Sequence, residues 1–229
     1  MKTNNFILLA ALLGLVACGN NGGGSGDADS TRAVSKELVE ATPGTYYSVL
    51  RPVNFRSNGF FPYGAATIVV KGDEIQVNTS MDDDQPVPHR QTVHIGTRCP
   101  SVEADDTNGD GFVDYDEAMR VVGGALMPLD GDLNSQSSGA EIYPRGRAMT
   151  YQKSASLSKV NSDLWRKDEN PSANFVKLQE GQGIGFEGRV VLIHGTSQGS
   201  LPASVASYNG EPAHISLPVV CGVLKKISE

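Results

Sequence analysis

The stretch VVKGDEIQV, residues 69–77, has two β-rich arms separated by Gly72-Asp73, a pattern typical of a tight β-hairpin. Outward from it, short apolar or alternating runs recur between Thr45 and Ile227, and glycine, proline and asparagine separate them. Apolar residues at every second position favour half-buried strands. We therefore predict an all-β fold, an antiparallel sandwich or barrel. We expect one short helix in the run DYDEAMRVV, and LSKVNSDLW also has helical spacing.

The first twenty residues, MKTNNFILLAALLGLVACGN, have the features of a bacterial secretory signal: Lys2, an apolar run, and small residues before a cysteine. The apolar run is shorter than the about 20 residues that a membrane-spanning helix needs. Leu15-Val16-Ala17-Cys18 resembles the lipobox of bacterial lipoproteins, which implies cleavage before Cys18 and diacylglycerol on its sulfur. An ordinary signal peptide or an uncleaved anchor is the alternative. We expect a signal peptide at 1–17, lipidated Cys18 and a flexible tether at 18–44, and a sandwich domain at 45–229.

The charge balance restricts the partners. The formal net charge of the 229-residue chain is −7, which argues against binding to nucleic acid and against electrostatic adhesion to anionic lipid. Attachment to a membrane is therefore expected through the lipid on Cys18 alone. That anchor would place the protein in the cell envelope, at the outer membrane or at the outer face of the cytoplasmic membrane.

The chain has three cysteines. If Cys18 is lipidated, Cys99 and Cys221 remain as an even pair in an oxidising compartment, and a disulfide between them is the natural inference. Two buried free thiols are the alternative.

The segment DTNGDGFVDYDE, residues 106–117, fits the twelve-position calcium loop of an EF-hand. Gly111 stands at the sharp turn of position 6. The expected calcium ligands are Asp106, Asn108, Asp110, the carbonyl of Phe112, Asp114 through water, and Glu117. The alternative is a solvated acidic turn without metal. Pro100 and Gly123-Gly124 leave little room for flanking helices, so we expect a structural ion site rather than a calcium sensor.

Three further stretches are together similar to the copper/zinc superoxide dismutases: TVHIG followed by Cys99, GRVVLIHG, and VVCGVLKKI. The resemblance implies an eight-stranded Greek-key sandwich, a disulfide from Cys99 to Cys221, and copper-binding positions at His94 and His194. Calcium would then order the connection that zinc orders in those relatives.

The metal set of that family is incomplete here. A metal-binding H-x-H strand needs histidines two apart, and this chain has Thr92 and His94 instead. No histidine lies between His94 and His194, and Pro218 occupies the place of the family's guiding arginine. His89 could join His94 and His194 around copper or zinc. We favour the alternative that these are core histidines bonded to backbone, and expect His214 to be an ordinary strand residue.

Gly195-Thr196-Ser197-Gln198-Gly199 fits the nucleophile elbow of a serine esterase. That motif needs a helix after the serine, then an acid and a histidine on separate loops, and only Glu211 and His214 follow, three residues apart. We therefore interpret Ser197 as a loop residue. The acidic run Asp82-Asp83-Asp84 is interpreted as a solvated hairpin tip.

Two functions remain. The first is a calcium-binding, lipid-anchored cell-envelope protein, a non-enzymatic structural or interaction module. The second is a copper-binding, superoxide dismutase-like redox protein that uses His94 and His194. The sequence identifies no protein partner or substrate.

Overall fold

The computed structural model describes residues 41–54, 60–134, 142–165, 176, 178, 181–208 and 210–228. The predicted signal peptide at 1–17 and Cys18 lie outside these residues, as does most of the predicted tether at 18–44.

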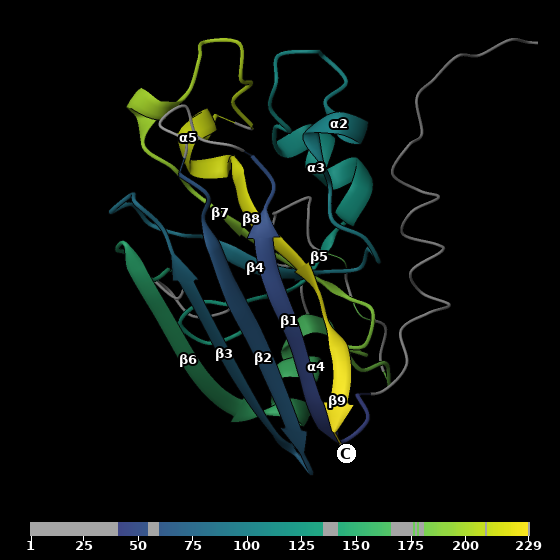
Figure 1. The fold of residues 1–229 in the computed structure, drawn as a ribbon. Coiled ribbons are helices and arrows are strands. Elements are labelled where there is room, and N and C mark those ends of the chain that lie inside the picture. Colours follow the sequence, from purple (N-terminus) through teal and green to yellow (C-terminus); the bar gives the residue numbers. More distant parts are fainter. Residues whose placement is uncertain are drawn as a thin grey trace, which may run out of the picture.

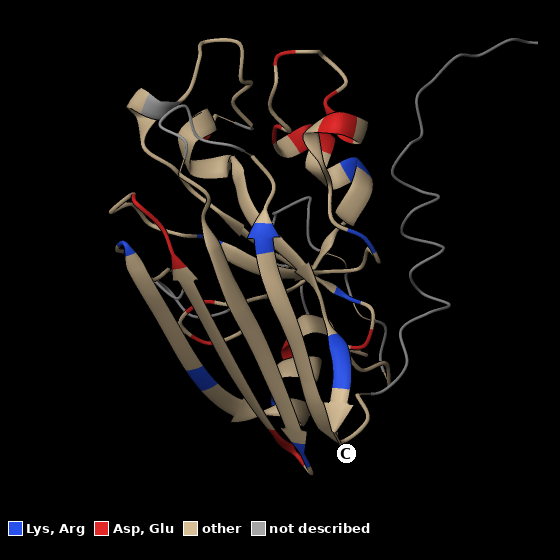
Figure 2. Cartoon of the chain, viewed as in Figure 1, with Lys and Arg blue, Asp and Glu red and all other residues tan. Residues whose placement is uncertain are grey.

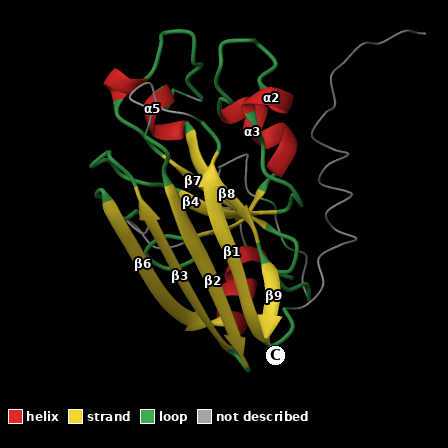
Figure 3. Cartoon of the chain, in the orientation of Figure 1, coloured by secondary structure: helices red, strands yellow, loops and turns green. Residues whose placement is uncertain are grey.

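Strands are the main regular structure of the described residues, and the helices are short (Figure 3). The strands are β1 (Gly44–Pro52), β2 (Tyr63–Lys71), β3 (Glu74–Asp82), β4 (Gln91–His94), β5 (Ala125–Pro128), β6 (Ala148–Ser156), β7 (Val190–His194), β8 (Pro218–Val223) and β9 (Lys225–Ser228). The helices are α2 (Val102–Asp105), α3 (Tyr115–Val122), α4 (Leu157–Trp165), α5 (Ala213–Ser216) and the 3₁₀ turn η2 (Gln198–Ser200). Both runs with helical spacing are therefore helices, α3 and α4.

The strands form one curled antiparallel sheet in the order β5-β4-β7-β8-β1-β2-β3-β6, and β9 also pairs with β1. β1 joins the two halves of the sheet, because its end pairs with β8 through Arg51 and Pro52 while the rest pairs with β2. The pairings β3–β6 and β4–β7 join strands far apart in sequence and are Greek-key crossovers. The predicted all-β, sandwich-like fold is confirmed (Figure 1).

The predicted hairpin is formed by β2 and β3, which pair along their whole length from Tyr63–Asp82 to Lys71–Glu74. Gly72 in the turn has a φ of 59°, a conformation that glycine adopts without a steric penalty. Asp73 beside it accepts a hydrogen bond from the backbone N–H of Ser158 at 2.7 Å. The turn therefore also holds the start of α4.

The main core lies between the two halves of the sheet. Inward-facing residues of β1, β2 and β3 alternate with exposed ones, as in Tyr46 and Leu50 of β1. α4 lies behind β1 and β2 in Figure 1 and buries Leu157, Val160 and Leu164 in the same core.

A second apolar cluster lies on the other face of β4, β7 and β8, and we call it the outer cluster. It consists of Val53, Val113, Ala118, Val122, Val190, Leu192 and Cys221. Nearly every residue of these three strands is buried, because the main core covers one face and the segment carrying α2 and α3 covers the other.

The disulfide inferred from the cysteine count is present between Cys99 and Cys221, with Cα atoms 5.7 Å apart. The two cysteines are 122 positions apart in the chain. The bond fastens the segment before α2 to β8 at the edge of the outer cluster.

Gly222 offers a test of how closely β8 packs on β1. A Cβ atom there would lie 2.1 Å from Ser48 Oγ and 2.5 Å from the Val49 carbonyl oxygen, and the second is backbone that cannot rotate away. We expect Gly222→Ala to lower the free energy of unfolding by about 1–3 kcal/mol in urea denaturation. Gly199→Ala, where a Cβ meets nothing within 4 Å, is the control and should change stability little. Equal stability of both variants and the wild type would contradict this packing.

Candidate metal centre

The predicted calcium loop lies in the connection from β4 to β5, at the end of the molecule that also carries α5 (Figures 1 and 3). α2 has a single turn, and α3 begins directly after Asp114 and ends at Gly123, whose φ is 66°. Acidic residues gather on this insertion (Figure 2). The short flanking helices agree with the limits that Pro100 and Gly123-Gly124 set in the sequence.

The first half of the loop winds around Asp106. The Asp106 carboxylate accepts hydrogen bonds from the backbone N–H of Gly109 at 2.7 Å, Asp110 at 3.2 Å and Gly111 at 2.8 Å. Gly109 and Gly111 have φ values of 74° and 85°, so both turns need the left-handed conformation that favours glycine. The chain is therefore curved with its N–H groups toward the first predicted ligand.

The second half of the loop is held by Glu117, the last predicted ligand. Its Oε1 accepts from the backbone N–H groups of Thr107 at 2.7 Å and Asn108 at 3.2 Å. Its Oε2 accepts from the N–H of Asp114 at 3.0 Å, and Asp114 Oδ1 accepts from the Glu117 N–H, which forms a capping box at the start of α3. The Glu117 side chain is only 3% exposed, so one buried carboxylate connects both ends of the loop.

Carboxylates crowd the interior of this loop. Burial raises the pKa of Asp114 and the nearby charges of Glu117, Asp116 and Asp110 raise it further, although the N–H of Glu117 opposes the rise. Oδ2 of Asp110 is inaccessible to solvent and has no hydrogen-bond partner, while its Oδ1 accepts from the N–H of Phe112. Such an arrangement of oxygen atoms suits a hard divalent cation.

Within the described segments, no three carboxylate, imidazole or thiol side chains form a ready-made metal-binding group. The side chains of Asp106, Asn108 and Glu117 bind N–H groups of the loop instead. The donor set of the loop fits calcium in oxygen type and spacing, and ion binding would require Glu117 to exchange its N–H partners for the cation.

The middle of the loop is fixed to the sheet by Asn54, at the end of β1. Its side-chain oxygen accepts from the N–H of Val113 at 2.8 Å, and its Nδ2 donates to the carbonyl of Val113 at 2.9 Å and to that of Pro218 at 2.8 Å. The amide of one side chain therefore pairs with Val113 as a neighbouring strand would. All three hydrogen bonds of Asn54 are buried, and a buried polar group left without a partner is costly. These bonds therefore fix the position of the loop on the sheet.

The start of the insertion is fixed by an ion pair beside the disulfide. Arg98 donates two hydrogen bonds to Asp105, at 2.7 and 2.9 Å. These bonds lower the pKa of the Asp105 carboxyl. Cys99, the residue after Arg98, is bonded to Cys221 of β8. The disulfide therefore fixes Arg98 near the sheet, and the ion pair fixes Asp105, the residue before the loop, to Arg98.

His94 lies on the outer face of β4, next to Thr92 on that face. Nδ1 of His94 donates to the Gly123 carbonyl at 3.0 Å, and Nε2 accepts from the Thr92 hydroxyl at 2.5 Å. Burial lowers the pKa of His94 to about 4, so the ring is neutral at pH 7. Both ring nitrogens of His94 thus have protein partners. One partner is Thr92, which stands where the H-x-H pattern has its first histidine.

His194 and His89 lie near the other end of the β4–β7 pair. His194 is 1% exposed, its Nδ1 donates to the Arg90 carbonyl at 3.4 Å, and its buried Nε2 has no hydrogen-bond partner. Burial, then the charge of Arg90, holds the pKa of His194 well below its usual value. His89 Nδ1 donates to the His194 carbonyl at 3.3 Å, and its Nε2 lies 3.7 Å from Asp83 Oδ2. Asp83 is 1% exposed, so interpreting its acidic run as a solvated tip was wrong.

The outer cluster continues into a group of aromatic and charged side chains around Tyr115, position 10 of the loop. The Tyr115 ring lies 4.1 Å from that of Tyr208 and 5.6 Å from that of His194, measured between centroids. The guanidinium of Arg90 lies 5.4 Å from the Tyr115 centroid and pairs with Glu211 at 2.9 Å. Burial raises the pKa of Tyr115 to about 12.

The remaining predicted residues lie in the β7–β8 connection. The prediction that His214 is a strand residue is wrong: His214 lies in α5, because the turn between Pro212 and Leu217 is helical. A 3₁₀ turn of three residues follows Ser197, and Glu211 is paired with Arg90. This arrangement does not resemble the strand, sharp turn and helix of a nucleophile elbow.

The sequence did not reveal Asn54 or the group around Tyr115. Asn54 is 59 positions from Val113, and no local pattern links the two. The apolar and aromatic residues Phe112, Val113 and Tyr115 in the second half of this acidic loop were the signal that it contacts an apolar surface.

No protein-family model matches the chain, and no curated protein sequence gives a significant match. None of the helices in the described segments has the length and apolar character needed to cross a membrane.

The buried, neutral state of His94 predicts acid sensitivity. Its pKa is about 4 in the folded chain and about 6.5 in an unfolded one, so the stability it contributes is complete above pH 6.5 and is lost as the pH falls toward 4. At pH 5 the loss is about 2 kcal/mol. His94→Asn removes this titration, so between pH 7.5 and 5 it should lose about 2 kcal/mol less of its unfolding free energy than the wild type.

The measurement is urea denaturation at four pH values between 7.5 and 5. His214→Asn, at a half-buried position of α5, is the matched control and should follow the wild type. A wild type and a His94→Asn variant that lose the same stability would show that His94 is not held neutral in the fold.

Proposed function

We propose that the chain is a calcium-binding, lipid-anchored protein of the bacterial cell envelope, a non-enzymatic structural or interaction module. The observation that supports this best is the place of Glu117, whose carboxylate joins positions 2, 3 and 9 of the twelve-residue loop. The last ligand of a calcium loop must reach back across the loop in this way if it is to share an ion with the first.

In the proposed complex the chain supplies oxygens from six places. They are Asp106, Asn108, Asp110, the carbonyl of Phe112, Asp114 through water, and Glu117. A cation there would give Asp110 Oδ2 a partner and would offset the mutual repulsion that now contributes to the raised pKa of Asp114. No redox step or substrate is required for this role.

The ion is proposed to stabilise the cover over the outer cluster. The insertion is fixed at its start by the disulfide and Arg98–Asp105, and in its middle by Asn54. Between these fixed points the loop depends on its own hydrogen bonds. Calcium at about 0.1–1 mM, the range typical of extracellular modules, would add a bond between the two halves of the loop.

The membrane anchor is proposed from the sequence alone. Lipid on Cys18 and a polar tether rich in glycine up to residue 44 would hold the sandwich at a membrane surface, at the outer membrane or the outer face of the cytoplasmic membrane. The negative charge of the chain leaves lipid as the means of attachment.

A copper-binding, superoxide dismutase-like role is the second candidate, and the buried Nε2 of His194 is the observation that favours it. It is weaker because both nitrogens of His94 already have partners. Each imidazole is also 1% exposed, and a catalytic copper needs an open position for its substrate.

Calcium binding should depend on Glu117. We expect one equivalent of calcium to bind the purified lipidated protein in detergent, with a Kd of about 0.1–1 mM by isothermal titration calorimetry. Glu117→Gln, which removes the charge that closes the loop, should weaken binding at least about tenfold.

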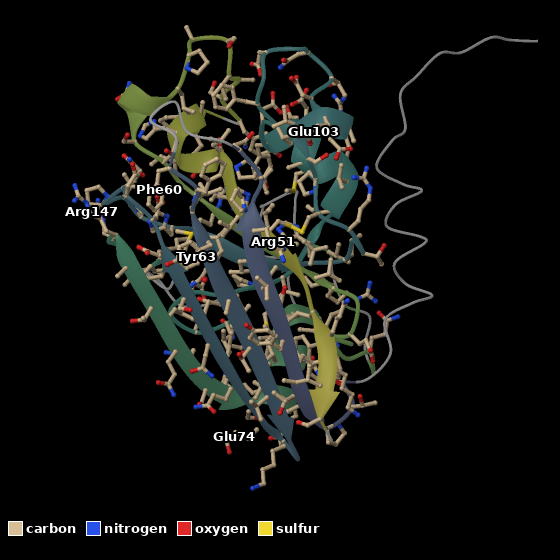
Figure 4. All side chains as sticks on the ribbon, viewed as in Figure 1. Arg51, Phe60, Tyr63, Glu74, Glu103 and Arg147 are labelled. Carbon is tan, nitrogen blue, oxygen red and sulfur yellow. A yellow bond between two sulfur atoms is a disulfide. The ribbon has the colours of Figure 1, made fainter. Side chains whose placement is uncertain are left out.

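Glu103→Gln is the matched control, because Glu103 is exposed on α2 outside the predicted ligand set (Figure 4). It should bind as the wild type does. Binding of no calcium at millimolar concentration, with copper retained through dialysis, would instead support the second candidate.

A further inference from the structure

We propose that calcium controls the order of the β7–β8 connection, residues 195–217, and that Tyr115 transmits the effect. This inference rests on the proposed calcium site and adds its consequence: binding at the loop stabilises a second stretch of surface that is distant in sequence.

The β7–β8 connection has few buried apolar side chains of its own. Val205 and Leu217 are buried, whereas Pro202, Ala203 and Ser204 are exposed. η2 and α5 each have three or four residues. Segments with so little buried apolar surface open locally at a small free-energy cost.

The middle of this connection is a narrow turn closed by Tyr208 and Glu211. Each donates its backbone N–H to the other's carbonyl, at 3.1 and 2.7 Å. Tyr208 then stacks on Tyr115 with 4.1 Å between ring centroids, and Glu211 pairs with Arg90 at 2.9 Å. Tyr208 therefore contacts Tyr115 directly, and Glu211 contacts it through Arg90, because Arg90 also lies over the Tyr115 ring.

Tyr115 is in turn fixed by the predicted ligands on both sides of it. Asp114 is the N-cap of α3, Tyr115 is the first residue of that helix, and Glu117 is its third residue and the partner of Asp114 in the capping box. Tyr115 is 7% exposed, so its ring has little freedom once α3 is formed. An ion bound by Glu117 and, through water, by Asp114 would replace the bond from Glu117 to the Asp114 N–H with a link through the cation. It would therefore still join the residues on either side of Tyr115, and fix the first turn of α3 and the surface on which Tyr208 packs.

The two connections lie side by side at one end of the molecule in Figure 1, with α5 and η2 on one and α2 and α3 on the other. Coupling between two sites is reciprocal, so a partner that orders the β7–β8 connection will also raise the affinity for calcium.

Hydrogen–deuterium exchange of the full-length lipidated protein in detergent, with 5 mM calcium or with excess chelator, tests the proposal. In the wild type we expect calcium to slow exchange at least threefold in both 106–117 and 198–212. Tyr115→Leu should bind calcium within about threefold of the wild-type affinity and protect 106–117, but should lose the added protection of 198–212. Tyr115→Phe, which keeps the ring, should behave as the wild type.

Tyr208→Ala provides the same test from the other side without changing the calcium loop, and it serves if Tyr115→Leu does not fold. Calcium-dependent protection of 198–212 that survives Tyr208→Ala, or survives in a folded Tyr115→Leu, would overturn the role of Tyr115. A wild type that binds calcium and protects 106–117 alone would overturn the coupling and leave the calcium site standing. A wild type that binds no calcium would overturn the proposed function itself.

Discussion

The structure depends on a cover over the outer face of β4, β7 and β8. β7 and β8 carry apolar side chains on both faces, as in Val190 and Leu192 against Val191 and Ile193 of β7. On the outer face of β4 lie instead Thr92 and His94, which are hydrogen-bonded to each other and buried. A sheet half that is apolar on both faces needs burial on both, since an exposed face would cost about 25 cal/mol per Å² of apolar surface left in water. The segment from Ile95 to Gly124 supplies that cover, and Val113, Ala118 and Val122 complete the outer cluster from its side.

A cover made from an acidic loop creates an electrostatic problem. Burial, and after it the charges of neighbouring carboxylates, raises the pKa of Asp114, yet the apolar residues of the loop must stay docked on the sheet. Backbone N–H groups of the loop partly stabilise these carboxylates, because they donate hydrogen bonds to Asp106 and Glu117. N–H dipoles stabilise individual carboxylates, but they do not neutralise the net charge of the group. A divalent cation in the loop would do both, and this is the physical argument for the structural ion that we propose at the edge of the cover.

Sequence patterns predicted what is local and failed where the partner lies far along the chain. The hairpin at Gly72-Asp73, helix α3 and its end at Gly123 follow from turn and helix signals within a few residues. The disulfide followed from counting cysteines. The bonds of Asn54 to Val113 and the stack of Tyr115 on Tyr208 join segments that only the Greek-key crossovers bring together, so no window of sequence contains both partners. The wrong interpretation of Asp83 has a different origin, because His89 is only six residues away: three consecutive acids look solvated until the fold buries one of them against that imidazole.

The histidines favour placing the proposed cation at the rim of the sandwich and not on its face. In a catalytic copper or zinc centre each ligating imidazole must have one nitrogen free for the metal, and one coordination position must remain open. Here the loop that would carry calcium also places the Tyr115 ring beside that of His194, and the carbonyl of Gly123, after α3, accepts a hydrogen bond from His94. A docked loop and a copper centre would therefore occupy the same surface around His94 and His194. When the loop is docked, both imidazoles are buried, neutral hydrogen-bonding groups. Stabilising the cover with calcium favours the docked state, and this argues for a structural ion over a redox centre.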